Sequence, residues 1–132
     1  MEAENNWFVS EINYEYKNSV VNKSFKFAIR IIKFYKILIE RENKYYPLFK
    51  QLLRSGTSIG ANITEAQSSP SKKDFINKLN IGLKEANETK YWIELLKETE
   101  LINEKEYLSV LNDCTELIKL LTSIIKTSKE NL

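Results

Sequence analysis

The sequence PLFKQLLRSGTSIGANITEAQ, residues 47–67, decides the fold. Its small and apolar residues recur every three or four positions, which is the repeat of an amphipathic helix. On a helical projection they gather on one side: Phe49, Leu52, Leu53, Gly56, Ile59, Gly60, Ile63 and Ala66. A narrow polar strip lies elsewhere and consists of Arg54, Ser58, Asn62 and Glu65. We therefore predict a helix over residues 47–67, with Pro47 in the first turn, where its missing N–H costs no hydrogen bond.

Inside this stretch, GTSIG at residues 56–60 matches the G-x-S-x-G pattern that exposes a catalytic serine in α/β-hydrolases. That serine sits between a strand and a helix and needs a base, whereas the residues before Gly56 form a helical pattern and the chain has no histidine. We therefore interpret Gly56 and Gly60 as packing residues that let another helix approach closely. Gly82 and Ala86, farther along the chain, offer a matching small patch.

Three other stretches also show helical periodicity. They are residues 20–42, 71–99 and 104–127. Start signals at Ser71 and Asn103 precede the last two. Because the connections are short, successive helices must run antiparallel. The sequence predicts an all-α, up-down-up-down antiparallel four-helix bundle over residues 20–128, with residues 1–19 as an N-terminal extension that forms a strap or a short helix.

The first of these helices has an unusually wide apolar arc. We expect its inner face to carry Ala28, Ile31, Ile32, Tyr35, Leu38 and Ile39. Phe27, Phe34 and Ile37 widen the arc beyond one stripe, which indicates contact with more than one neighbour. Part of this surface is therefore expected to meet another subunit.

The composition excludes several kinds of site. Among 132 residues there is no histidine, which excludes Ser-His-Asp and Cys-His catalysis and histidine-containing zinc sites. The single cysteine, Cys114, cannot form an intrachain disulfide, and its apolar neighbours predict a buried side chain. With no leader sequence and no apolar run of about 18 residues, we expect a cytoplasmic protein without membrane segment, cofactor or metal site.

Two acidic motifs suggest an enzyme. Glu85-x-x-Glu88 and Asp113-x-x-Glu116 resemble the paired acids with which all-α nucleotide pyrophosphohydrolases hold Mg²⁺. If the intervening helix faces point into the core, however, these acids lie at helix flanks and do not converge. Solvated helix faces are the favoured interpretation, and a magnesium-dependent pyrophosphohydrolase is the alternative.

The first helix also carries a run of positive charge. Residues 20–39 contain no acid and five cations: Lys23, Lys26, Arg30, Lys33 and Lys36. The first four fall within about 80° of one another on a helix. Such a stripe can follow a phosphate backbone, although a solvated lysine face would give the same pattern. The stripe makes the first helix the candidate nucleic-acid-binding element.

The central sequence LLRSGTSIGANITEAQ, followed by SKKDFINKLNIGLKEANETKYWIELL, resembles the signature of the four-helix-bundle family associated with intervening sequences of 23S ribosomal RNA genes. The resemblance runs from about residue 23 to residue 125. It implies a left-handed up-down bundle, assembly as a homo-oligomer that is a pentameric ring in known relatives, and no catalytic reaction. The polar positions of the motif fall on Arg54, Ser58, Asn62, Glu65, Glu85 and Glu88.

The same resemblance points to a relative of similar fold, the accessory variability determinant of diversity-generating retroelements. That relative binds nucleic acid and a reverse transcriptase through basic surfaces, and is far more basic than this chain, whose net charge is +2. We therefore expect a non-enzymatic, oligomeric bacterial protein that binds RNA or DNA, or a nucleic-acid enzyme, through its first helix. The alternative is a structural protein–protein adaptor that binds no nucleic acid.

Overall fold

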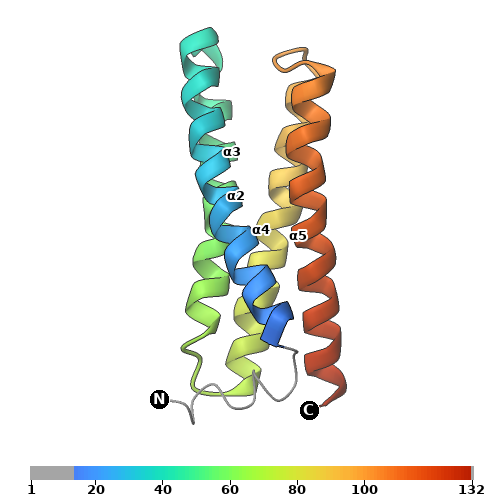
Figure 1. Cartoon of the computed structure of the whole chain (residues 1–132). Helices are drawn as coiled ribbons and strands as arrows, with labels where there is room; N and C mark the ends of the chain where they lie inside the picture. The colour runs from blue at the N-terminus through green and yellow to red at the C-terminus, as the bar shows by residue number, and fades with distance from the viewer. Residues whose placement is uncertain (1–13, 132) are drawn as a thin grey trace.

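The structure, a computed structural model, describes residues 14–131, with side chains from residue 19 onward. Its long elements are α2 (Tyr14–Arg41), α3 (Tyr46–Ala66), α4 (Lys72–Glu98) and α5 (Glu104–Glu130), and a short 3-10 helix, η1 (Asn43–Tyr45), precedes α3. The α2–α3 and α4–α5 turns lie at one end of the molecule and the α3–α4 turn lies at the other (Figure 1). The described residues contain no strand, and the predicted all-α, up-down-up-down four-helix bundle is confirmed.

The first helix begins earlier than the sequence suggested. It starts at Tyr14 and not near residue 20, so residues 14–19 of the predicted extension form its first turns. No proline or glycine occurs between Tyr14 and Val20 to stop a helix there. The rest of the predicted extension, residues 1–13, lies outside the described residues.

Local signals fix where α4 and α5 begin. Ser71 is the N-cap of α4, and its hydroxyl accepts a hydrogen bond of 3.1 Å from the backbone N–H of Asp74. Asn103 caps α5, and the carboxylate of Glu106 accepts a hydrogen bond from the Asn103 N–H, which completes a capping box. Both predicted start signals are confirmed.

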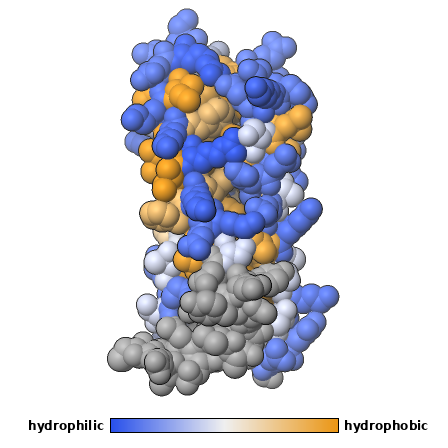
Figure 2. All heavy atoms as spheres, in the orientation of Figure 1, coloured by the Kyte–Doolittle hydropathy of each residue, from blue (hydrophilic) through white to orange (hydrophobic). Residues whose placement is uncertain are grey.

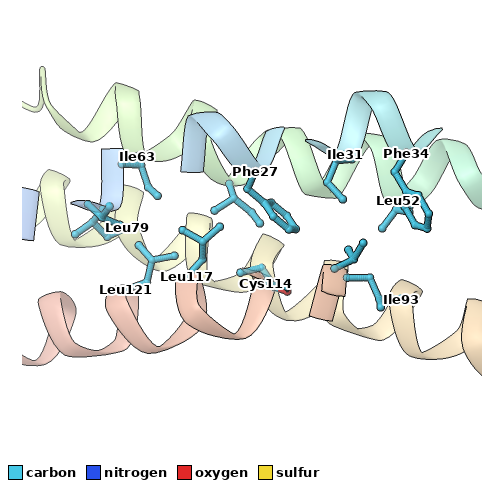
Figure 3. Close-up of a cluster of buried hydrophobic side chains, with 14 of the residues drawn as sticks. Phe27, Ile31, Phe34, Leu52, Ile63, Leu79, Ile93, Cys114, Leu117 and Leu121 are labelled. Atoms are coloured by element: carbon cyan, nitrogen blue, oxygen red, sulfur yellow. The ribbon is translucent and has the colours of Figure 1, made fainter. Parts of the chain in front are cut away.

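The core is built from one apolar face of each helix. Figure 3 shows side chains from all four helices meeting between the ribbons, among them Phe27, Ile31, Leu52, Ile63, Leu79, Ile93, Leu117 and Leu121. Each such side chain contributes about 1.5–3 kcal/mol when it is fully removed from water. Burial of these faces is therefore the main source of stability.

The inner face of α2 differs from the predicted one. Phe27 and Phe34 are buried, whereas Ile32, assigned to the inner face from the sequence, is 45% exposed. The apolar arc of this helix is wide enough to allow several rotations, so periodicity alone cannot select one. The helix is turned so that the Phe27 side of the arc, and not the Ile32 side, enters the core.

The helices do not pack equally closely around the bundle. α3 packs along both α2 and α4, and α5 packs along α4, but α2 and α5 meet over fewer residues. Figure 1 shows the α2–α3 and α4–α5 hairpins separating toward the end where their turns lie. The α2–α5 seam is therefore the loosest of the four.

Gly56 and Gly60 face α2. A Cβ atom on Gly56 would lie 2.9 Å from both Cγ atoms of Ile31, which is fully buried. A Cβ atom on Gly60 would lie 3.2 Å from the backbone oxygen of Ser24. Neither a packed β-branched side chain nor a helix backbone can withdraw easily, so glycine at these two positions is what lets α2 approach α3 this closely.

The second small patch has different neighbours. Gly82 faces α3, where the nearest atom to an added Cβ would be the Ile59 oxygen at an ordinary 3.6 Å. Ala86 faces α5, and its carbonyl accepts a hydrogen bond of 3.3 Å from the thiol of Cys114. The two small patches of the sequence therefore do not face each other, because they lie at different seams.

This difference predicts opposite effects of the same substitution. Gly56→Ala should lower the free energy of unfolding by about 1–2 kcal/mol, because overpacking against Ile31 outweighs the gain in helix propensity. Gly82→Ala should be neutral, or stabilising by up to about 1 kcal/mol, because the added methyl finds room. Urea unfolding followed by circular dichroism measures both, and equal effects of the two variants would contradict the packing described.

The burial of the Cys114 thiol leads to a second prediction. Burial raises the pKa of Cys114 to about 12, so almost no thiolate exists in the folded protein near neutral pH. The native protein should not react with a thiol reagent such as dithionitrobenzoate at pH 8, and the urea-unfolded protein should react at once. Rapid reaction of the native protein would show that Cys114 is accessible.

Candidate nucleic-acid interface

Two basic residues of α2 are held by α5. The Nζ atom of Lys23 lies 2.6 Å from Oε2 of Glu116, and Nη1 of Arg30 lies 2.5 Å from Oδ2 of Asp113. Arg30 also donates hydrogen bonds to the backbone oxygen and to the hydroxyl of Ser109. Two of the five predicted nucleic-acid-binding residues therefore already form ion pairs with another helix of the same chain.

The other three basic residues, Lys26, Lys33 and Lys36, are exposed. None of them forms an ion pair with another residue among those whose side chains the structure describes, residues 19–131. Lys26 and Lys33 are two turns apart, about 10 Å along the helix axis, and both border the α2–α5 seam. We call Lys26, Lys33 and Lys36 the lysine face.

Two hollows lie along the α2–α5 seam, and Arg30 borders both. The first, of about 330 Å³, has apolar walls from Phe34, Ile37 and Val110, and we call it the apolar hollow. The second, of about 270 Å³, contains the ion pair between Lys23 and Glu116. The cations that line the two hollows outnumber the acids: Lys23, Lys26, Arg30, Lys33 and Lys105 against Glu106, Asp113 and Glu116.

The polar strip of α3 faces α4. Nη1 of Arg54 lies 3.2 Å from Oε2 of Glu85, and Nη2 of Arg54 pairs with Glu88. The indole N–H of Trp92 donates a hydrogen bond of 2.9 Å to the same Glu88 oxygen. Arg54 thus links α3 to α4 through two carboxylates, one of which also accepts a hydrogen bond from an indole. This explains why the motif places an arginine and two glutamates at these spacings.

The remaining motif positions are also used within the bundle. Ser58 donates a hydrogen bond of 2.6 Å to the Arg54 carbonyl, and Asn62 donates one of 2.8 Å to the Ser58 carbonyl, one turn back along α3. Glu65 lies 2.8 Å from the ammonium of Lys78 on α4. The Ser58 hydroxyl is therefore engaged by its own helix and has no base beside it.

The two acid pairs weighed as a magnesium site lie at different seams. Glu85 and Glu88 point to Arg54 on α3, whereas Asp113 and Glu116 point to α2. Among the side chains that the structure describes, those of residues 19–131, there is no group of three or more acidic, histidine or cysteine residues that could hold a metal ion. The acids do not converge, because the helix faces that carry them point away from each other.

The outer face of α2 carries exposed apolar side chains beside the lysine face. Phe25 is 67% exposed, and Ile29 and Ile32 follow it one and two turns later. We call these three residues the hydrophobic ridge. Figure 2 shows hydrophobic atoms among hydrophilic ones in the upper part of the side that α2 and α5 form.

No described helix is long and apolar enough to cross a membrane.

One ion pair spans the α2–α5 seam near the η1 end. The guanidinium of Arg41 donates two hydrogen bonds, of 3.1 and 2.8 Å, to the carboxylate of Glu106, which also caps α5 through the Asn103 N–H. The hydrogen bond from Arg41 lowers the pKa of Glu106, and the backbone N–H of Asn103 adds to this effect. Glu106 therefore fastens the start of α5 to the end of α2.

These features define an antiparallel four-helix bundle whose signature residues join α3 to α4. Residues 16–123 match the profile of the 23S rRNA-intervening sequence proteins, and the chain belongs to this family. A crystal structure of a protein of unknown function from the S23 ribosomal protein family of Bacteroides thetaiotaomicron shares 58% identity and a TM-score of 0.80, over 84% of this chain and 98% of that one. No curated protein matches.

Several residues of the seam were missed by the sequence reasoning. Lys105 borders the apolar hollow, Ser109 binds Arg30, and Arg41 binds Glu106. Each lies on a helix far along the chain from its partner. No periodicity within one helix indicates such pairings, and only the order and rotation of the helices could have revealed them.

The Arg41–Glu106 pair predicts a pH dependence. Because the pKa of Glu106 is lowered in the folded state, its contribution is present above the ordinary glutamate pKa near 4.5 and is lost as the pH falls through the folded value. Glu106→Gln should cost about 0.5–1 kcal/mol at pH 7 and flatten the loss of stability below pH 5. Urea unfolding at pH 7 and pH 4 measures this, with Glu94→Gln, at an exposed glutamate of α4, as the control. An unchanged acid sensitivity in Glu106→Gln would contradict it.

Proposed function

We propose that this protein is a non-enzymatic, oligomeric bundle that binds the phosphate backbone of RNA or DNA through the lysine face. The observation that carries the proposal is that these three lysines are exposed and form no ion pair with any side chain of residues 19–131. Cations in this state can exchange their counterions for phosphates, which gives salt-dependent and largely sequence-independent binding. The family's name refers to intervening sequences of 23S rRNA and names no ligand, so the proposal rests on the lysine face.

We infer that several copies act together. Three phosphate contacts give a slope of log K against log salt of only about −2 to −3, which is typical of a weak site. Repetition of the lysine face around a homo-oligomer, for which the family resemblance suggests a pentamer, would multiply the avidity. The hydrophobic ridge supports this inference, because Phe25, Ile29 and Ile32 have the spacing at which one helix packs on another.

The hydrophobic ridge also supports a second candidate, a protein–protein adaptor. Phe25 is the most exposed of the large apolar side chains in the described chain, and a protein partner could cover it. A nucleic-acid enzyme is one such partner. Capture of partners from lysate with and without nuclease treatment separates the two functions, because a protein adaptor retains its partner after nuclease and a nucleic-acid-binding protein does not.

The lysine face can be tested by charge reversal. In the combined variant Lys26→Glu, Lys33→Glu, Lys36→Glu, the affinity for RNA should fall at least tenfold at low salt, and the salt dependence should weaken. The matched control is Lys119→Glu, Lys126→Glu, Lys129→Glu, which changes the net charge equally through exposed lysines of α5. Fluorescence anisotropy over a salt series measures binding, and light scattering checks the oligomer mass.

Two results would remove the proposal. One is an absence of RNA and DNA binding by the unaltered protein even at low salt. The other is an equal loss of affinity in both charge-reversed variants, because this would show a response to net charge alone and not to the lysine face of α2.

A further inference from the structure

The apolar hollow combines an apolar interior with cations from two helices. Phe34 and Val110 are buried in the core. Ile37, which is 48% exposed, forms one wall of the hollow. Lys33 of α2 and Lys105 of α5 border the same hollow, and both are exposed. A ligand that fills the hollow therefore meets hydrocarbon inside and ammonium groups at the rim.

Some charged groups around the hollow are bound by other residues of the protein, and others are not. The carboxylate of Glu106 is bound by Arg41 and the Asn103 N–H, and Arg30 is bound by Asp113 and Ser109. Lys33 and Lys105 form no ion pair with the described side chains of residues 19–131. The charges left to meet a ligand are positive, so the complementary ligand is anionic with a flat or compact apolar part.

The second hollow of the seam lacks this combination. There Lys23 is paired with Glu116 and Arg30 with Asp113, which leaves Lys26 as its one lysine without a carboxylate partner. Its apolar residues, Phe27 and Leu117, are buried, so it offers no exposed apolar side chain to a ligand. Of these two hollows, the apolar hollow is thus the one where lysines without ion pairs border an exposed apolar side chain, Ile37. Its volume of about 330 Å³ exceeds that of a single nucleobase.

We propose that the apolar hollow receives an unpaired nucleotide, with the base against Phe34, Ile37 and Val110 and the flanking phosphates near Lys33 and Lys105. This inference rests on the proposed nucleic-acid binding and specifies its form. In a duplex the bases are stacked and paired, so only phosphates and groove edges reach the protein. A single strand can turn a base into an apolar site while its phosphates meet cations. The hollow therefore selects single-stranded over double-stranded nucleic acid.

The test compares one labelled RNA strand with the duplex that it forms with its complement, by fluorescence anisotropy at constant salt. The unaltered protein should bind the single strand more tightly. Ile37→Ala should weaken single-strand binding by roughly fivefold and change duplex binding by less than about twofold, because hydrocarbon is lost only where a base enters. Ile81→Ala, at a similarly exposed isoleucine on α4, is the matched control and should change neither.

The outcomes separate this inference from the proposed function. Salt-dependent binding of both RNA forms, with an unchanged ratio in Ile37→Ala, would overturn the inference and leave the lysine face intact. Binding of neither form by the unaltered protein would remove both. A change of oligomer mass in Ile37→Ala, measured by light scattering, would show that the hollow is covered by another copy and would also overturn the inference.

Discussion

The close approach of α2 to α3 at Gly56 and Gly60 determines where every other face of α2 points. The Ser24 backbone and the Ile31 side chain lie directly against these glycines, and this close packing favours the observed rotation of α2. That rotation turns Phe27 and Phe34 inward and leaves the hydrophobic ridge outside. It also directs Lys23 and Arg30 toward the acids of α5. The candidate interface is therefore a consequence of two missing side chains on a different helix.

Individual helices could be predicted from the sequence because their signals are local. The repeat of residues 47–67 and the caps at Ser71 and Asn103 each involve residues within a few positions of one another. The rotation of α2 could not be predicted, since its apolar arc is wide enough to satisfy the helical period with either Phe27 or Ile32 inside. The ion pairs of Lys23 and Arg30 were missed for the same reason, because they depend on the relative rotation of two helices.

Two hypotheses drawn from the sequence concern residues of the same seam. The acidic motif at Asp113 and Glu116 suggested a metal site, and the basic run of α2 suggested a phosphate site, yet these residues bind one another in the fold. Both pairs are half-exposed, so each contributes at most about 1 kcal/mol and is weakened by salt. They connect α2 to α5 across the loosest seam. They leave the three lysines of the lysine face without carboxylate partners.

The residues of the family signature lie at the α3–α4 seam, where their polar groups bind one another and are not available to a ligand. Arg54 joins α3 to α4 through Glu85 and Glu88, and the buried hydroxyls of Ser55 and Thr89 meet at 2.9 Å across the same seam. A seam closed in this way presents few unengaged groups to a ligand, so the signature accounts for the fold rather than for recognition. The α2–α5 seam has the opposite character, with hollows, exposed cations and fewer contacts. Variation in function among proteins of this architecture is therefore expected to follow the residues of α2 and α5 that line this seam.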